Sequence, residues 1–199
     1  DAKHMLVFPQ DPSLDNSKPI LRSNNHFQGL QFTWSVWIFI DDIHYKENQY
    51  KHIFHKGNDN LDLVNESNYG VNFPNNGPGL YITPNSNELL IIMNTFENVV
   101  EKINVPNIPL NKWLNVIIRV SEQQLLDVYI NGTLSKRHKL NSVPKQNYGD
   151  IYVAMNGGFS GFISELKYYH NALGTNAIQN IVESGPNLAL KKNTSLYAS

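Results

Sequence analysis

Hydrophobic and polar positions alternate along much of the chain, which is the period-two pattern of β-strands. The pattern is strongest at residues 32–40, where every second residue from Phe32 to Ile40 is apolar. Trp37 and Phe39 continue the apolar character on the opposite face. A strand that is apolar on both faces lies centrally in a sheet and is covered twice. We therefore predict a central strand here, with a layer packed on each side of it.

The other predicted strands are short and are bounded by Gly, Pro, Asn or Asp. They are expected at residues 5–8, 52–56, 69–73, 79–83, 88–94, 99–105, 113–120, 125–130, 151–154 and 159–169. Asn131-Gly132 predicts a type I′ hairpin, because that turn needs positive φ at both central positions. Many strands at regular spacing, without alternating helices, favour an all-β antiparallel sandwich or barrel.

One short helix interrupts this pattern near the end of the chain. Thr175 or Asn176 is expected to cap it, and Gly185-Pro186 to end it. Its apolar residues form a stripe suited to packing on the sandwich: Ala177, Ile178, Ile181 and Val182. We predict one domain at residues 27–185. We expect an extended segment, residues 1–26, before it, with one edge strand, and a tail or last strand, residues 186–199, after it.

Composition narrows the classes of partner. The 28 Asn outnumber the 20 Leu, and Asn favours turns over helix and strand interiors. The excess of Asn also fits an AT-rich genome, because the codons for Asn are AT-rich. With 16 basic and 17 acidic residues, the chain gives no electrostatic reason to expect nucleic acid or an anionic membrane. No apolar run is longer than that of residues 36–40, which is far shorter than the ~20 residues that span a bilayer. The absence of Cys excludes disulfides and thiolate sites.

Several segments resemble the laminin-G-like, concanavalin A-like jelly-roll family. Residues 32–40 and the later residues 53–57 resemble its opening strands. Residues 113–120, followed by residues 126–132, are similar to its Trp strand and Asn-Gly hairpin. Residues 161–173, with the helix after them, resemble its closing block. The resemblance implies two facing antiparallel sheets in a jelly roll.

The resemblance leaves the activity open. Members of the family are mostly binding modules for glycans or proteins, some bind calcium, and related folds include glycoside hydrolases and polysaccharide lyases. A fold of this kind hosts many functions, so the site has to decide between them.

The residues argue against catalysis. Related glycosidases carry a Glu-x-Asp-x-x-Glu strand that places two carboxylates together, and this chain has none. Glu165 is alone in its strand, and the side chains of Asp41 and Asp42 should point in opposite directions. Only three Arg are present for a lyase, and there is no Gly-x-Ser-x-Gly for a serine hydrolase. We predict no catalytic residues.

Calcium is the cofactor that the sequence favours, because it needs only clustered carboxylate, amide and backbone oxygens. Residues 58–62 supply such groups after the Lys56-Gly57 turn, and Asp42 ends an earlier strand. We predict Asp59, Asp62 and Asp42 as calcium ligands; the alternative is a solvated Asn/Asp turn.

The seven histidines do not form a zinc motif. His52 and His55 are three residues apart, so in a regular strand they lie on opposite faces. We expect them to be exposed or at a strand edge.

A glycan site would need an aromatic ring beside hydrogen-bonding groups. The three Trp lie in strands at positions expected to face the core, so rings in loops or at strand ends are better candidates. We predict Tyr81 and Tyr148, with Asn75 and Asp150 from neighbouring loops, as ligand-binding residues. The alternative is that these residues form ordinary turns.

Together these observations predict a non-catalytic, lectin-like module that recognises a glycan on a surface. Attachment at a virion or cell surface is a hypothesis that rests on the composition and the lectin-like resemblance. The first alternative is a protein-binding structural domain in a larger surface assembly, and the second is a polysaccharide hydrolase or lyase. The expected partner is thus a glycan or a surface protein, with no nucleic acid and no membrane insertion.

Overall fold

The computed structural model describes residues 1–21, 24–26, 29–98, 100–121, 124–188 and 197–198. Phe27 and Val99, at which predicted segments begin, lie outside the described residues, as does most of the predicted tail.

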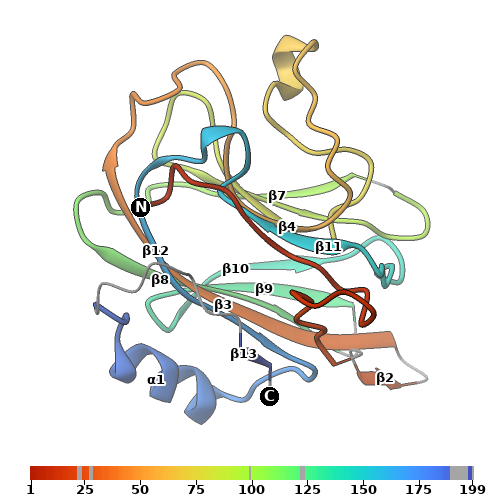
Figure 1. Ribbon diagram of the computed structural model, residues 1–199. Helices are drawn as coiled ribbons and strands as arrows, with labels where there is room; N and C mark the ends of the chain where they lie inside the picture. The colour runs from red at the N-terminus through yellow and green to blue at the C-terminus, as the bar shows by residue number, and fades with distance from the viewer. Residues whose placement is uncertain (22–23, 27–28, 99, 122–123, 189–196, 199) are drawn as a thin grey trace.

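Two sheets face each other as the two layers of a sandwich (Figure 1). The first has the order β1 (Leu6–Phe8), β11 (Asp150–Val153), β4 (Lys51–Gly57), β5 (Gly79–Ile82), β6 (Leu89–Met93) and β7 (Glu101–Val105). The second has the order β10 (Thr133–Lys139), β9 (Leu125–Ile130), β8 (Trp113–Val120), β3 (Gly29–Asp42), β12 (Ser160–Tyr169) and β13 (Tyr197–Ala198), and β2 (Asn24–His26) also pairs with β3. Neighbouring strands are antiparallel except β13, which runs parallel to β12. The helical elements are η1 (Glu66–Asn68), η2 (Met155–Gly157) and α1 (Thr175–Ser184).

The core between the sheets follows the predicted alternation of β3. The five predicted inward side chains are all at most 3% exposed, and all belong to the main hydrophobic core: Phe32, Trp34, Val36, Ile38 and Ile40. β3 lies between β8 and β12 in the middle of its sheet. The prediction of a central, doubly covered strand is confirmed.

Each sheet also has a cover on its outer face. On the six-stranded sheet, the connection between β4 and β5, residues 58–78, packs Val71 against Tyr81, Leu90 and Ile92. On the other sheet, α1 lies against the outer face, where Ile178 is buried (Figure 1). The sandwich therefore has four layers over part of its area.

The β9–β10 turn and the two ends of α1 test the expectations about local structure. Asn131 and Gly132 have φ values of 50° and 83°, so the β9–β10 hairpin turn has positive φ at both positions, as predicted. The helix ends at Gly185 as expected, but its N-cap is Gly174, with no side-chain cap. The prediction that Thr175 or Asn176 caps the helix is wrong, because the helix begins one residue earlier than its apolar stripe indicates.

The strand predicted at residues 69–73 is also wrong. Only an isolated bridge between Leu61 and Asn72 occurs there. Val71 is fully buried and Phe73 partly buried, as in a strand, but both pack on top of the sheet instead of within it.

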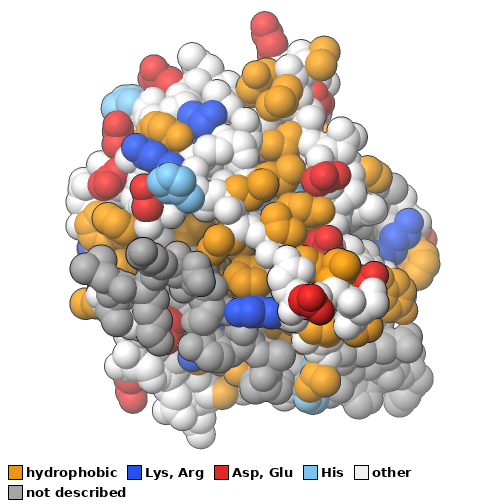
Figure 2. Space-filling model, viewed as in Figure 1, with side chains coloured by type: hydrophobic (Ala, Val, Ile, Leu, Met, Phe, Trp, Pro, Cys, Tyr) orange, Lys and Arg blue, Asp and Glu red, His pale blue; other side chains and the backbone are white. Residues whose placement is uncertain are grey.

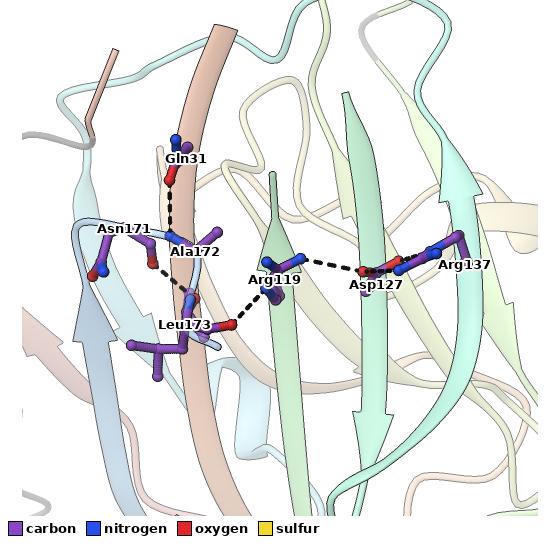
Figure 3. Close-up of polar contacts among 8 residues, drawn as sticks. Gln31, Arg119, Asp127, Arg137, Asn171, Ala172 and Leu173 are labelled. Carbon is purple, nitrogen blue, oxygen red and sulfur yellow. Dashed lines mark hydrogen bonds and ion pairs between the residues drawn. The ribbon is translucent and has the colours of Figure 1, made fainter. Parts of the chain in front are cut away.

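A buried carboxylate links the strands of the second sheet on its outer face (Figure 3). Asp127 on β9 is fully buried and accepts hydrogen bonds from Arg137 Nε at 2.8 Å and Arg137 Nη2 at 3.0 Å. It also pairs with Arg119 Nη1 at 3.4 Å. Arg119 Nε donates in turn to the Leu173 carbonyl at 2.7 Å. This network joins the edge strand β10 to the segment that leads into α1.

We predict that Asp127→Asn lowers the free energy of unfolding by about 1.5 kcal/mol, because the hydrogen bonds from Arg119 and Arg137 then no longer end on a charged carboxylate. Urea denaturation measures the change. Asp15→Asn, at an exposed position in the N-terminal segment, is the matched control and should change stability by less than about 0.5 kcal/mol. Equal stabilities for the two variants would contradict the structural role of this network.

Candidate functional site

A pocket of about 170 Å³ opens at one edge of the sandwich, between the N-terminal segment and the loop of residues 145–149. Its inner wall includes the aromatic side chains Phe32, Trp34 and Tyr168, and its polar residues include Lys145 and Asn147. An aromatic wall with a few polar groups at the mouth is the usual composition of a small-molecule site.

Tyr148 lies at the rim of this pocket, and its side chain is 76% exposed. The loop that carries it is held by the buried side chain of Lys56 on β4. Lys56 Nζ donates to the carbonyls of Asn147 at 2.7 Å and Gly149 at 2.8 Å, and Asn147 Nδ2 donates back to the Lys56 carbonyl at 3.1 Å. Burial lowers the pKa of Lys56 to about 8, while the charge of Asp150 opposes this shift. The exposed ring therefore stands on a fixed loop.

Asn75 and Asp150 lie near the same end of β4, around Gly57. Asp150 pairs with Gly57, and its carboxylate accepts a hydrogen bond from the Gln10 amide at 2.9 Å. Asn75 passes so close that a Cβ on Gly57 would lie 2.1 Å from the Asn75 carbonyl oxygen. The structure thus places three of the four predicted ligand residues, Tyr148, Asn75 and Asp150, at one end of the sandwich. Their contact with a ligand stays a prediction.

Tyr81 is the fourth, and the structure corrects its assignment. Its side chain is fully buried under residues 58–78, where its hydroxyl donates to Asn76 Oδ1 and accepts from the Asn72 amide at 3.3 Å. Burial raises the pKa of this phenol. The ring is not available for stacking on a sugar, because the connection that follows β4 folds back over the sheet.

The two histidines of β4 were predicted on opposite faces, exposed or at a strand edge, and both expectations are wrong. His52 pairs with Tyr81 and Phe54 with Leu80, so the extra residue Ile53 forms a β-bulge. Ile53 and Phe54 both enter the core. The bulge brings His52 and His55 to the same side of the sheet, where they are 1% and 0% exposed.

Their hydrogen bonds determine the tautomer of each ring. The Met155 amide donates to His52 Nδ1 at 2.9 Å, so His52 carries its proton on Nε2. Nε2 then donates to His55 Nδ1 at 2.6 Å, and His55 Nε2 donates to the Asn58 carbonyl at 2.6 Å. Burial lowers the pKa of His52 well below its usual value, with the neighbouring His55 adding to the effect. Burial likewise lowers the pKa of His55 to about 4, against the opposing effects of Asn58 and Asp59. This chain of bonds exists only while both rings are neutral.

Asparagine side chains continue this buried polar layer beneath residues 58–78. Asn58 Oδ1 accepts from Asn72 Nδ2 at 3.0 Å and from the Asn75 amide at 3.1 Å. Asn76 Nδ2 donates to the Asn72 carbonyl at 2.9 Å, and Asn94 Nδ2 donates to the Pro74 carbonyl at 2.9 Å. The sequence signal for this layer was the concentration of seven Asn in residues 58–76.

The predicted calcium ligands do not form a cluster. Asp62 Oδ1 accepts from the amides of Asn65 at 2.9 Å and Val64 at 3.0 Å, and these bonds lower the pKa of Asp62. Asp42 accepts from the His44 amide. Within the described ranges, no group of three or more His, Asp or Glu side chains could hold a metal ion. Calcium binding through Asp42, Asp59 and Asp62 stays a prediction, with no such group to support it.

The tryptophans differ from the expectation that all three face the core. Trp34 lies in the core between the sheets, and Trp37 is buried on the outer face. Trp113 is only half-buried on that outer face, with ring centroids 5.7 Å from Phe39 and 6.4 Å from Phe162. Because these three residues pair across β8, β3 and β12, their rings form a row across the sheet.

The molecular surface agrees with the near-neutral composition. On the face shown in Figure 2, acidic and basic side chains are interspersed with hydrophobic ones. Among the described residues, no helix is both long enough and apolar enough to cross a membrane.

Facing antiparallel sheets with this strand order define a jelly-roll sandwich of the lectin type. The sequence profile of the concanavalin A-like lectin/glucanase superfamily matches residues 14–179, so the chain belongs to that family. The predicted fold class and the resemblance are therefore confirmed. A comparison with curated protein sequences gave no match.

Solved structures share this fold at low sequence identity. The receptor-binding domain of botulinum neurotoxin D aligns with a TM-score of 0.58 and 16% identity, over 92% of this chain and 48% of that chain. The binding domain of serotype G gives 0.58 and 16%, over 90% and 42%. A candidate carbohydrate-binding protein from Bacteroides ovatus gives 0.51 and 15%, over 75% and 40%. This chain spans less than half of each, and the similarity establishes the fold alone.

The buried histidine pair predicts that stability falls in mild acid. The folded pKa values lie below the unfolded value of about 6.5, so the unfolded chain binds more protons as the pH falls from about 6.5 to 4. The free energy of unfolding should therefore decrease over this window, by up to about 1.4 kcal/mol per pH unit for each histidine.

Urea denaturation at several pH values measures this slope. His55→Gln should flatten it, while His44→Gln, at an exposed position, should leave it unchanged. The same slope in His55→Gln and the wild type would show that the pair does not titrate as described.

Proposed function

We propose that this chain is a non-catalytic, lectin-like module that binds a glycan at the pocket beside Tyr148. The observation that carries the proposal is an exposed aromatic ring, on a loop fixed by Lys56, at the mouth of a pocket with an aromatic wall. A sugar ring has an apolar face and a rim of hydroxyls, so it needs a stacking surface next to directional hydrogen-bonding groups.

The surroundings of Tyr148 supply both requirements. Lys145 offers an ammonium and Gly77 a backbone segment at the same opening, while the Asn147 side chain already bonds to Lys56 and Gly149. Because the loop is already held by Lys56, little conformational freedom is lost when a ligand binds. The structural neighbours named as receptor-binding and carbohydrate-binding proteins support a binding role for this fold.

The lining of the pocket also supports a non-catalytic role. None of the described residues that line it is Asp or Glu. Hydrolysis of a glycosidic bond commonly uses two carboxyl groups on either side of that bond.

A protein partner is the alternative, and the row of rings at Phe39, Trp113 and Phe162 favours it. Phe162 is 46% exposed, and large aromatic side chains are enriched in protein interfaces. Crosslinking of the intact chain to a defined surface protein, lost in Phe162→Ser, would support this alternative. Attachment at a virion or cell surface stays a prediction for either partner.

We expect saturable binding on a glycan array and at least a tenfold loss of affinity in Tyr148→Ala, because a stacking ring contributes about 1.4 kcal/mol. Tyr129→Ala, on β9 of the other sheet, is the control and should bind like the wild type. Both variants should unfold at nearly the wild-type temperature. No binding to any glycan on a broad array, or unchanged binding in Tyr148→Ala, would overturn the proposal.

The same measurements with and without calcium test the predicted cofactor. If calcium binds, it should raise the melting temperature of the wild type, and the rise should disappear in Asp59→Ala and Asp62→Ala. Differential scanning calorimetry with added calcium or a chelator measures this, and no rise in the wild type would end the calcium hypothesis.

A further inference from the structure

A second pocket lies between β12 and α1, on the outer face of the second sheet, whereas Trp34 and Tyr168 line the first pocket from the inner face of the same strands. Its volume of about 310 Å³ is at the lower end of the ~300–1,000 Å³ typical of small-molecule sites. It is lined by side chains of the sheet and of the helix, among them Ser35, Trp37, Glu165, Lys167, Tyr169 and Ile181. We call it the helix groove.

A β-bulge places an additional carboxylate in the helix groove. Ser164 pairs with Trp37 and Lys167 pairs with Ser35, so Glu165 and Leu166 together oppose the single residue between them on β3. Leu166 is buried in the core, which leaves Glu165 as the extra residue. Its φ is +49°, in the left-handed region that is unfavourable for a residue with a side chain. Strained residues of this kind cluster at functional sites.

Hydrogen-bonding capacity that no described residue uses remains at three side chains of the helix groove: Glu165, Tyr169 and Ser35. The Glu165 carboxylate makes no hydrogen bond to a described residue, and Lys167 Nζ is 3.9 Å from it. Burial, and secondarily the charge of Glu165, raises the pKa of Tyr169, so its hydroxyl remains a donor. Ser35 Oγ accepts from Asn115 Nδ2 at 3.2 Å, which leaves its own proton to donate. The groove therefore offers acceptors and donors side by side.

Leu173, which lines the helix groove, lies in a segment that is held on the sheet before any ligand arrives (Figure 3). Arg119 Nε donates to the Leu173 carbonyl, and the Leu173 amide donates to Thr33 Oγ1 at 3.0 Å. Thr33 Oγ1 donates to the Asn171 carbonyl at 2.9 Å, and the Ala172 amide donates to Gln31 Oε1 at 3.3 Å. These bonds hold the segment before α1 on the sheet, so the groove is preorganised.

We propose that the helix groove is a second binding site, for a single uncharged sugar residue, independent of the pocket beside Tyr148. Opposite charges on Glu165 and Lys167 compensate each other, which disfavours an ionic ligand. A carboxylate acceptor next to the hydroxyl donors of Tyr169 and Ser35 matches adjacent hydroxyls of a sugar, and Trp37 and Ile181 give the groove an apolar wall. The volume suits one ring instead of an extended chain.

Isothermal titration of the intact chain with methyl glycosides of glucose, galactose, mannose and N-acetylglucosamine tests this site. We expect saturable binding of at least one of them, weakened at least tenfold by Glu165→Gln and changed less than about twofold by Tyr148→Ala. No binding of any glycoside overturns the proposal. Binding lost in Tyr148→Ala but kept in Glu165→Gln assigns it to the other pocket and also overturns this one. The two sites can therefore fail separately.

Glu165→Gly tests whether the strained backbone is retained for the carboxylate. Glycine adopts positive φ without steric cost, so the melting temperature should rise by about 2 °C while glycoside binding is lost. Lys46→Gly, at a residue with φ of +50°, is the matched control and should leave glycoside binding unchanged. A lower melting temperature in Glu165→Gly would show that the side chain stabilises the fold. It would then contradict the inference that the positive φ is retained for ligand binding.

Discussion

The alternation of side chains along each strand is the constraint on which this structure depends. The core between the sheets is filled only if every second residue of each strand points inward, and β3 follows this rule from Phe32 to Ile40. An extra residue interrupts the rule on β4, at Ile53, and on β12, at Glu165. Each bulge keeps the core filled and changes what the outer face carries. On β4 the result is a buried histidine pair, and on β12 it is a carboxylate in a groove.

The outer faces can be buried because most polar groups beneath each cover find partners; among the described residues, Asn115 Oδ1 is the buried side-chain atom that has none. An unpaired polar group removed from water costs about 1–3 kcal/mol, which a short cover with few apolar contacts would not offset. On the first sheet, amide groups such as Asn72 and Asn76 supply both donors and acceptors. On the second, Asp127 and Arg119 do so with charge. The high content of Asn thus serves a structural purpose besides forming turns.

Most of the fold was predictable because period-two alternation, Asn-Gly turns and the helix stop are local signals. The candidate sites were less so, because they depend on contacts between distant segments. Nothing near His52 and His55 in the sequence indicates an extra residue between them. The sequence therefore does not predict that both rings lie on the same side of the sheet. Tyr81 has the pattern of an accessible strand-end ring, yet residues 58–78 fold over it. Tyr148 was predictable because Gly149 and Asp150 beside it mark a loop, and Glu165 had been set aside because it is alone in its strand.

The hydrogen bonds from Met155 through His52 and His55 to Asn58 also have a fixed direction. A backbone amide at one end can only donate, and a carbonyl at the other end can only accept. Each neutral ring has one donor and one acceptor, so neither ring can turn over or change tautomer without breaking bonds on both of its sides. The segment around η2 and the connection after β4 are therefore coupled through the sheet, and a displacement at Met155 disturbs the bond at Asn58.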